Sequence, residues 1–387
     1  MIKTDVKYAP PNTILLTRQS NFELLRIFAM IMIIAHHFAV HGGLEYSSNT
    51  TLGAIYMWFL HSGGKIGVNI YFLISGYFLI SEKRFKTEKI IKIWLQVFFY
   101  SVLFYGIMSI YKLTITHNFS FSIRELLSAL FPISFEQWWF ASTYFALYIF
   151  HPFINRFLNS LNQEYHVKLL VVMFILWSVI SNFTVKNFQY SQLSWALFLY
   201  CFAGYYKLYI DNLYVKTKKV FSITITSFFV VFAAKIAIIA LSNKISFLKM
   251  YSIRQFAEND LLLFLISIMV FISFKSIRFN SNFVNVIASS TFGVYLIHDN
   301  ENIRQFLQNH AYARLPVDST WLFPYSIFTI VAIFAVCSCI ELIRKCFFEK
   351  NYSKLSKIIS VKIEHLITIF NSKIYHIFNV NDQPQSN

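Results

Sequence analysis

The sequence predicts an all-α protein, a polytopic integral membrane bundle of about ten transmembrane helices. Three observations lead to this fold class. Of the 387 residues, 56% are hydrophobic and only 13% are charged, whereas soluble domains carry about 25% charged residues. Aromatic residues make up 19% of the chain, with 44 Phe, which suits contact with lipid and with the membrane interfaces. The third observation is a series of apolar runs that are long enough to cross a bilayer.

These apolar runs define the expected helices, of which the second and the ninth are somewhat short. They lie at residues 22–41, 66–81, 92–113, 138–158, 167–185, 192–210, 219–241, 259–275, 283–298 and 322–343. The runs show no internal repeat and enclose no soluble domain, so we expect residues 22–347 to form one membrane domain. The first twenty residues are polar and lack the short apolar core of a cleavable signal peptide. We therefore expect residues 1–21 to be a short N-terminal segment that precedes an uncleaved first helix.

The distribution of basic residues predicts the orientation of the helices. If the N-terminus is inside, the predicted inner segments hold 23 of the 34 Lys and Arg residues, and the predicted outer loops hold 9. Cationic residues collect on cytoplasmic loops, so both termini are expected in the cytoplasm. The net charge of +16 then reflects membrane topology and gives no reason to expect nucleic acid as a partner.

The segment after Phe347 has a basic and amphipathic pattern. Within residues 348–387, apolar residues recur at spacings of three and four between lysines. Such a tail is expected to lie on the inner leaflet as a helix, held by apolar burial and by anionic lipids. A plain solvated tail is an alternative.

The four cysteines indicate neither a disulfide framework nor a metal site. All of them lie in or beside apolar segments, without the spacing of metal ligands, at positions Cys201, Cys337, Cys339 and Cys346. Free cysteines of this kind usually pack as small apolar residues. We expect no metal and no permanently bound cofactor.

Ionisable residues in the first apolar run, NFELLRIFAMIMIIAHHF, make it the best candidate for a functional helix. Such residues are costly at membrane depth and usually have a function. Arg26 and His37 are eleven residues apart, which places them about 20° apart around a helix and roughly 16 Å apart along it. With the predicted orientation, Arg26 lies near the inner surface and His37 toward the outer one, while His36 points about 80° away from Arg26. His37 suits an acid–base role and Arg26 suits an anion such as phosphate. Alternatively, Glu23 and Arg26 only form an ion pair and His37 only packs.

Further candidates lie on the next helices. Asn69 and Ser75 could line a polar channel, although the glycines around them also suit close helix packing. Lys89 and Lys92 share one helical face on the inner side, where they either help Arg26 to hold phosphates or only mark the cytoplasmic side. His298 ends the ninth run on the predicted outer side, as His37 does.

Several of these residues occur in four motifs that span residues 23–298. The motifs are Glu23-x-x-Arg26 followed by His37, the run from Gly67 to Tyr77 (GVNIYFLISGY), Trp139-Phe140 with Tyr148 and Pro152, and the run from Ser290 to His298 (STFGVYLIH). In these motifs and in their order the chain resembles one known family, the acyltransferase family three membrane enzymes.

This resemblance implies transfer of an acyl group, usually acetyl, from cytosolic acetyl-CoA to a hydroxyl on the outer side of the membrane. It implies that His37 is essential and that Arg26, with Glu23 of the same motif, takes part in binding the acyl donor. It also implies that Trp139 and Tyr295 line the site. Lys89 and Lys92 stand where the family often has arginines, and lysine does not bind phosphate bidentately.

Some members carry an additional hydrolase-like outer domain, which we do not expect here, so the chain resembles the members that modify surface glycans within the membrane domain. The resemblance therefore predicts an O-acetyltransferase of a capsular polysaccharide or exopolysaccharide, or of its lipid-linked precursor, in a bacterial plasma membrane. The alternative is a non-enzymatic transporter or a polymerase of the same envelope pathway, although the repeated halves typical of transporters are not evident.

Overall fold

The computed structural model describes residues 19–43, 50–82, 85–117, 120–184, 188–212, 215–242, 244–252, 256–312 and 314–379. Helix accounts for 82% of the structure, and no strand occurs in these ranges. The all-α prediction is confirmed. The expectations for residues 1–18 and 380–387 fall outside the described residues.

The chain forms fifteen α-helices and three π-helical turns within the described ranges. In chain order they are α1 (Ser20–His41), α2 (Leu52–Leu79), α3 (Thr87–Thr114), α4 (Ile123–Leu130), α5 (Trp139–Ser160), α6 (Gln163–Phe174), η1 (Ile175–Val179), α7 (Ile180–Thr184), α8 (Gln192–Tyr205), η2 (Tyr206–Ile210), α9 (Thr217–Ser242), α10 (Ser246–Ser252), α11 (Leu261–Lys275), α12 (Asn282–Ala288), α13 (Thr291–His298), α14 (Glu301–Leu307), η3 (Gln308–Tyr312) and α15 (Leu322–Asn379).

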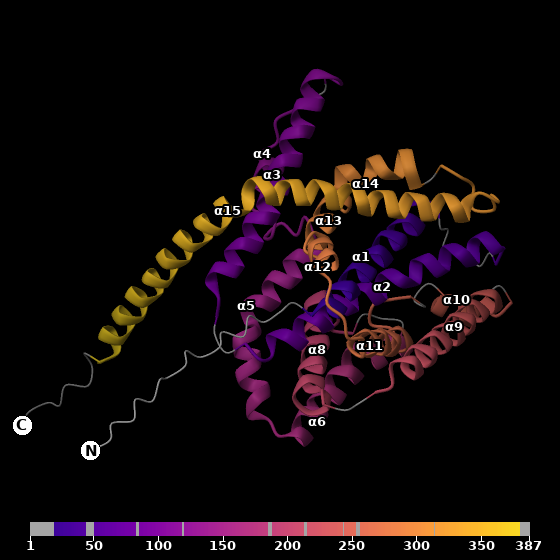
Figure 1. Ribbon diagram of the computed structural model, residues 1–387, viewed down its shortest axis with the longest axis horizontal. Coiled ribbons are helices and arrows are strands. Elements are labelled where there is room, and N and C mark those ends of the chain that lie inside the picture. Colours follow the sequence, from indigo (N-terminus) through magenta and orange to yellow (C-terminus); the bar gives the residue numbers. More distant parts are fainter. Residues whose placement is uncertain are drawn as a thin grey trace, which may run out of the picture.

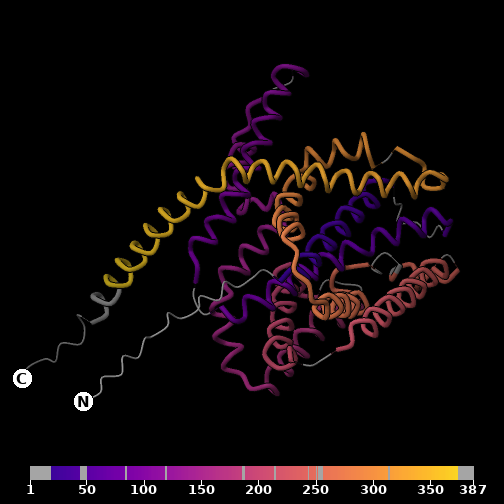
Figure 2. The backbone as a smooth tube through the Cα atoms, viewed as in Figure 1, coloured from indigo at the N-terminus to yellow at the C-terminus, as the bar shows by residue number. Residues whose placement is uncertain are grey.

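Helix α1 lies in the centre of this bundle (Figure 1). It packs along α2, and it also contacts α11, α12, α13 and α15 from the second half of the chain. The tube in Figure 2 shows the same arrangement, with the indigo start of the chain surrounded by orange and yellow segments. Because α1 is central, its ionisable residues can contact helices that are distant in sequence.

Glycines on α2 allow the close packing of α1 and α2. A Cβ at Gly64 would lie 2.3 Å from the Cβ of His36, and one at Gly67 would lie 2.6 Å from the carbonyl oxygen of Ala29. Without these glycines the two helices would have to separate. In a membrane such close contact supplies much of the association energy, because lipid tails solvate apolar side chains as well as protein does.

Helix α2 is longer than the apolar pattern predicts. It begins at Leu52 instead of residue 66, and Thr51 caps it by accepting a hydrogen bond from the backbone N–H of Ala54. Its glycine-containing start remains helical because α1 packs directly against it. The segment 52–65 is therefore helix and does not belong to an outer loop.

The single helix predicted at 283–298 is broken into α12 and α13. Ser289, Ser290 and Thr291 each donate a side-chain hydrogen bond to the carbonyl oxygen three residues earlier. Hydroxyl groups that bond locally to the backbone compete with the helical hydrogen bonds. The break gives α13 a direction of its own.

Helix α15 continues through the boundary that we expected near residue 347. It runs unbroken from Leu322 to Asn379, and Figure 1 shows that its second half extends away from the bundle. The location of this tail on the inner leaflet stays a prediction.

Five helical segments of the described chain are long and apolar enough to cross a membrane. They are Ser20–His41, Thr87–Thr114, Gln163–Thr184, Thr217–Ser242 and Leu322–Lys373. The other predicted spans fall on α2, α5, α8 with η2, α11, and α12 with α13. The total of ten spans and the orientation of the termini remain predictions.

Candidate active site

A cavity of about 370 Å³ lies along α1, with further walls from α2, α3, α5 and α13. Arg26 and His37 both line it. The helical spacing between them corresponds to roughly 16 Å along α1, so the cavity extends over about three helical turns. The prediction that these two side chains share one face agrees with this arrangement.

Arg26 and Lys89 contribute positive charge at one end of the cavity. The Nη1 atom of Arg26 lies 2.5 Å from Oε1 of Glu23. The Nζ atom of Lys89 lies 5.1 Å from the centre of the Tyr148 ring. Tyr71 helps to hold this part of α1, because its hydroxyl donates a hydrogen bond of 2.9 Å to the carbonyl oxygen of Arg26.

His37 and Asp299 form the other end of the cavity. Nδ1 of His37 lies 3.8 Å from Oδ1 of Asp299, and Nη1 of Arg304 lies 3.2 Å from the same oxygen. A separation of 3.8 Å is within ion-pair range but is longer than a hydrogen bond. Burial raises the pKa of Asp299 to about 6, and Arg304 opposes that effect.

His36 lines the same cavity, which the helical spacing did not predict. Its Nδ1 lies 2.8 Å from the carbonyl oxygen of His61, and its side chain packs where Gly64 leaves room. By contrast, Nδ1 of His37 has no hydrogen-bond partner among the described residues. Of the two neighbouring histidines, His37 therefore has the freer ring for proton transfer.

Four other predicted site residues line the cavity together with Arg26 and His37. Ser75 comes from α2, Lys89 from α3, Trp139 from α5 and Tyr295 from α13. The structure thus brings together six of the ten residues that the sequence singled out.

Three predicted residues lie beside the cavity without lining it. Glu23 contacts the cavity only through its ion pair with Arg26. His298 is buried behind His37, with ring centres 5.1 Å apart, and its Nδ1 lies 2.7 Å from the carbonyl oxygen of Val294. Lys92 lies 3.3 Å from Glu88 on the half-exposed side of α3, away from the cavity.

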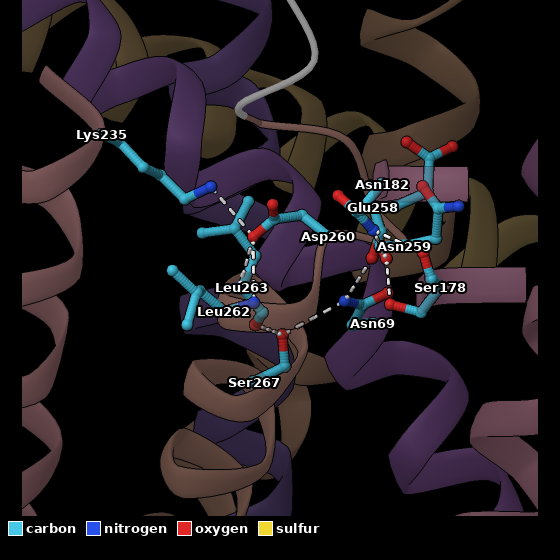
Figure 3. Close-up of polar contacts among 10 residues, drawn as sticks. All are labelled: Asn69, Ser178, Asn182, Lys235, Glu258, Asn259, Asp260, Leu262, Leu263 and Ser267. Atoms are coloured by element: carbon cyan, nitrogen blue, oxygen red, sulfur yellow. Dashed lines mark hydrogen bonds and ion pairs between the residues drawn. The ribbon is translucent and has the colours of Figure 1, made fainter. Parts of the chain in front are cut away.

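Asn69 is the fourth predicted residue that does not line the cavity, and its side chain instead connects helices through hydrogen bonds (Figure 3). Its Nδ2 donates to the carbonyl oxygen of Glu258 at 3.0 Å and to Ser267 at 3.2 Å, and its Oδ1 accepts from Nε1 of Trp195 at 2.9 Å. Both the amide nitrogen and the amide oxygen of Asn69 are therefore hydrogen-bonded inside the protein. The side chain is fully buried and does not line the cavity.

The segment that Asn69 holds also places a charged pair at the wall of the cavity. Lys65, a lining residue, lies 2.9 Å from Glu258. Two residues further along, Asp260 caps α11 and lies 2.9 Å from Nζ of Lys235, as Figure 3 shows. Lys235 is only 2% exposed, so its charge is balanced by Asp260 inside the protein.

Sequence reasoning missed several residues of the site. Asp299 directly follows His298, and Tyr71 lies midway between Gly67 and Ser75 at the four-residue spacing of a helix face, so both had a detectable signal. Tyr144 also lines the cavity, but nothing in the sequence distinguishes it from the other tyrosines of the chain.

A histidine beside a carboxylate can act as a general base or as a nucleophile. The carboxylate orients the imidazole ring and stabilises its protonated form. The distance between such partners is often long in the absence of substrate. Positive groups at the far end of the same cavity suit an anionic substrate group.

The fold and the cavity thus define a helical membrane protein with a histidine–carboxylate pair at one end of a cavity and cationic side chains at the other. Residues 19–342 match the family model described as an acyltransferase domain, and the chain belongs to acyltransferase family 3. It is a membrane acyltransferase. No curated protein and no solved structure matches the chain.

Proposed function

We propose that this protein transfers an acetyl group from cytosolic acetyl-CoA to a hydroxyl of a surface polysaccharide, or of its lipid-linked precursor, across a bacterial plasma membrane. The observation that carries the proposal is the single cavity lined by Arg26 and Lys89 as well as by His37. This cavity connects two cationic side chains that can bind phosphate with a histidine that can act as a base or a nucleophile in acyl transfer.

The donor enters from the end that the positive-inside rule assigns to the cytoplasm. Its phosphates lie near Arg26 and Lys89, and its thioester arm extends along α1 toward His37. The walls between these ends include the apolar side chains of Met30, Ile33 and Val68. These suit a slender, uncharged chain better than a second charged group.

In the reaction, His37 takes the proton from the acceptor hydroxyl while the oxygen of that hydroxyl attacks the thioester carbonyl. Asp299 stabilises the imidazolium that forms. The tetrahedral intermediate collapses, the C–S bond breaks, and the CoA thiolate receives the proton from His37. In the second form of this mechanism, a ring nitrogen of His37 attacks the thioester carbonyl and the C–S bond breaks to release the CoA thiolate. The acceptor hydroxyl then attacks the acetyl-imidazole, the C–N bond breaks to restore His37, and the hydroxyl proton passes to the CoA thiolate.

Transfer of radiolabelled acetyl groups tests the proposal. The purified protein in lipid nanodiscs, with acetyl-CoA and glycan from cells lacking the protein, should form labelled glycan. His37→Ala should lower the rate by about 10²-fold or more, the usual contribution of acid–base catalysis. His310→Ala is the matched control, because this histidine is exposed and lies outside the cavity.

Undiminished transfer by His37→Ala would refute both forms of the mechanism. Rapid quenching with acetyl-CoA alone separates them, because an acetyl-imidazole on His37 forms only if the histidine is a nucleophile. Unlabelled glycan with active donor turnover would refute the proposed acceptor.

A further inference from the structure

A second hollow, of about 450 Å³, lies between α3, α4 and α14. It is formed at the end of α3, where two connections between predicted spans meet. These connections are residues 114–137 and 299–321, and the predicted orientation places both on the outer side. Figure 1 shows α3 and α4 projecting together from the bundle at this place. Neither the family assignment nor the proposed transfer step gives this hollow a role.

The hollow adjoins the His37 end of the catalytic cavity. In two segments of the chain, residues one or two positions apart line the hollow and the catalytic cavity. Gln137 lines the hollow and Trp139 the cavity, while Asn300 lines the hollow and Asp299 the cavity. A ligand in the hollow therefore lies directly beside the residues that form the reactive end.

The order of residues along α3 also shows where the hollow lies relative to the two ends of the catalytic cavity. Lys89 at the start of this helix lines the cationic end of the catalytic cavity, whereas Ser101 to Lys112 line the hollow. Lys89 and Ser101 are separated by roughly 18 Å along the helix axis. The hollow thus lies on the side of the reactive end away from the donor phosphates.

Three helices turn polar faces toward the hollow. Tyr105 and Ser109 are one turn apart on α3, as are Arg124 and Ser128 on α4 and Glu301 and Gln305 on α14. These groups include hydroxyls and amides, which donate and accept hydrogen bonds. The exposed ring of Phe135 and the buried ring of Phe104 add apolar surface.

Sugars match this chemistry. Each hydroxyl of a sugar is both a donor and an acceptor, and the C–H faces of the ring pack on aromatic side chains. The lining contains two positive residues, Lys112 and Arg124, and two negative ones, Glu125 and Glu301. This balance favours an uncharged ligand over a phosphate or a uronate.

The wall between the hollow and the cavity is held in place by several contacts. Gln137 accepts a hydrogen bond of 2.7 Å from Ser101 and donates one of 2.9 Å to Ser128. The preceding Glu136 has φ of 49°, in the left-handed region that a residue with a side chain adopts at a cost. Such strain often occurs where a segment is held for function.

We infer that this hollow binds the acceptor, a neutral oligosaccharide segment whose hydroxyl reaches His37. The inference rests on the proposed function, which supplies a glycan acceptor. Donor and acceptor then approach His37 from opposite ends, and the acceptor is selected by α3, α4 and α14.

Glycan binding tests the inference separately from catalysis. The probe is a fluorescent, de-O-acetylated neutral oligosaccharide prepared from the surface glycan of cells that make the protein, and the full-length protein is in nanodiscs. The double variant Arg124→Ala/Gln305→Ala should bind it about tenfold more weakly, the effect expected for two lost hydrogen bonds. The matched control Arg314→Ala/Gln308→Ala removes the same residue types from exposed positions outside the hollow.

A second variant, Ser109→Trp, fills the hollow with a large side chain and should also abolish binding, whereas His37→Ala should bind normally. In transfer assays the double variant should raise the KM for the glycan about tenfold and leave the KM for acetyl-CoA unchanged. Unchanged glycan affinity in both hollow variants would overturn the inference. So would absence of binding to the wild-type protein, or a preference for phosphorylated fragments.

The two proposals fail in different ways. If the wild-type protein binds the oligosaccharide in the hollow but does not consume acetyl-CoA, the proposed transfer is wrong and the binding site stands. If acetyl transfer proceeds but the hollow variants bind like the wild type, the proposed function stands and the binding site is wrong.

Discussion

His37 and Asp299 are far apart in the chain, yet their side chains approach to 3.8 Å. Asp299 in turn lies 3.2 Å from Arg304. The same carboxylate therefore faces a histidine and an arginine. At the residue scale, the chemistry depends on whether the Asp299 carboxylate is ionised and on how strongly it interacts with His37 and with Arg304.

The acid side of the pH profile should report on Asp299. Its pKa is raised to about 6 by burial, so below about pH 6 the carboxyl becomes neutral and no longer stabilises protonated His37. Activity should therefore fall as the pH decreases through this range. Arg304 opposes the effect of burial, so Arg304→Gln should move the decline to higher pH.

The measurement is kcat/KM for acetyl transfer between pH 4.5 and 8. Arg314→Gln serves as the control, because this arginine is exposed and does not contact Asp299. A decline at the same pH in Arg304→Gln and the wild type would show that Asp299 does not determine it.

Arg26→Lys tests phosphate recognition at the other end of the cavity. Lysine retains the charge beside Glu23 but not the planar fork of donors that matches phosphate. We expect the KM for acetyl-CoA to rise about tenfold, the loss of one charge-assisted hydrogen bond, with little change in thermal stability. Initial rates at varied acetyl-CoA measure it, and an unchanged KM would argue against a phosphate contact.

At the scale of elements, α13 is the short helix that carries Tyr295 and leads to Asp299. It packs against α15 at Glu341, which is fully buried and whose hydrogen bonds connect α15 to α3. The carboxylate accepts hydrogen bonds from Tyr100 at 2.7 Å, from Gln96 at 3.0 Å and from Arg344 at 2.7 Å. Gly293 leaves the room for it, because a Cβ there would lie 2.4 Å from the Glu341 carboxyl group.

Gly293→Ala should therefore destabilise the protein. The added methyl group must displace α13 or a buried carboxylate, at a cost of about 1–3 kcal/mol, and activity should fall because Asp299 follows α13. Gly106→Ala on α3 is the matched control, since no described atom lies within 4 Å of its added Cβ. Thermal unfolding in detergent compares the two, and equal stability would contradict the tight packing.

At the scale of the whole molecule, the proposed reaction needs a defined direction across the membrane. Arg26 must lie toward the cytoplasm and His37 toward the outside, which the distribution of basic residues predicts. The hollow between α3, α4 and α14 must then open outward.

Labelling of single cysteines in intact cells tests this orientation. In a variant whose four native cysteines are replaced, a membrane-impermeant thiol reagent should label Arg314→Cys, whereas Lys216→Cys should react only after the cells are opened. Both positions are in described segments outside the helices. The reverse pattern would overturn the orientation and, with it, the proposed direction of transfer.

The sequence by itself determined the all-α class, the family, and the common face of Arg26 and His37. These follow from composition and from helical periodicity, which are local properties of the chain. It also pointed to Ser75, Lys89, Trp139 and Tyr295, which line the cavity. The break between α12 and α13 was missed although its three hydroxyl residues were visible.

Only the tertiary structure placed Asp299 beside His37, added Tyr144 to the cavity, and turned Asn69 toward Glu258 and Ser267. The physical reason is that helices in a bilayer associate through close packing and a few polar contacts, not through a hydrophobic pattern that can be read along one segment. Which faces meet depends on residues hundreds of positions apart, so the site is complete only once the helices have packed.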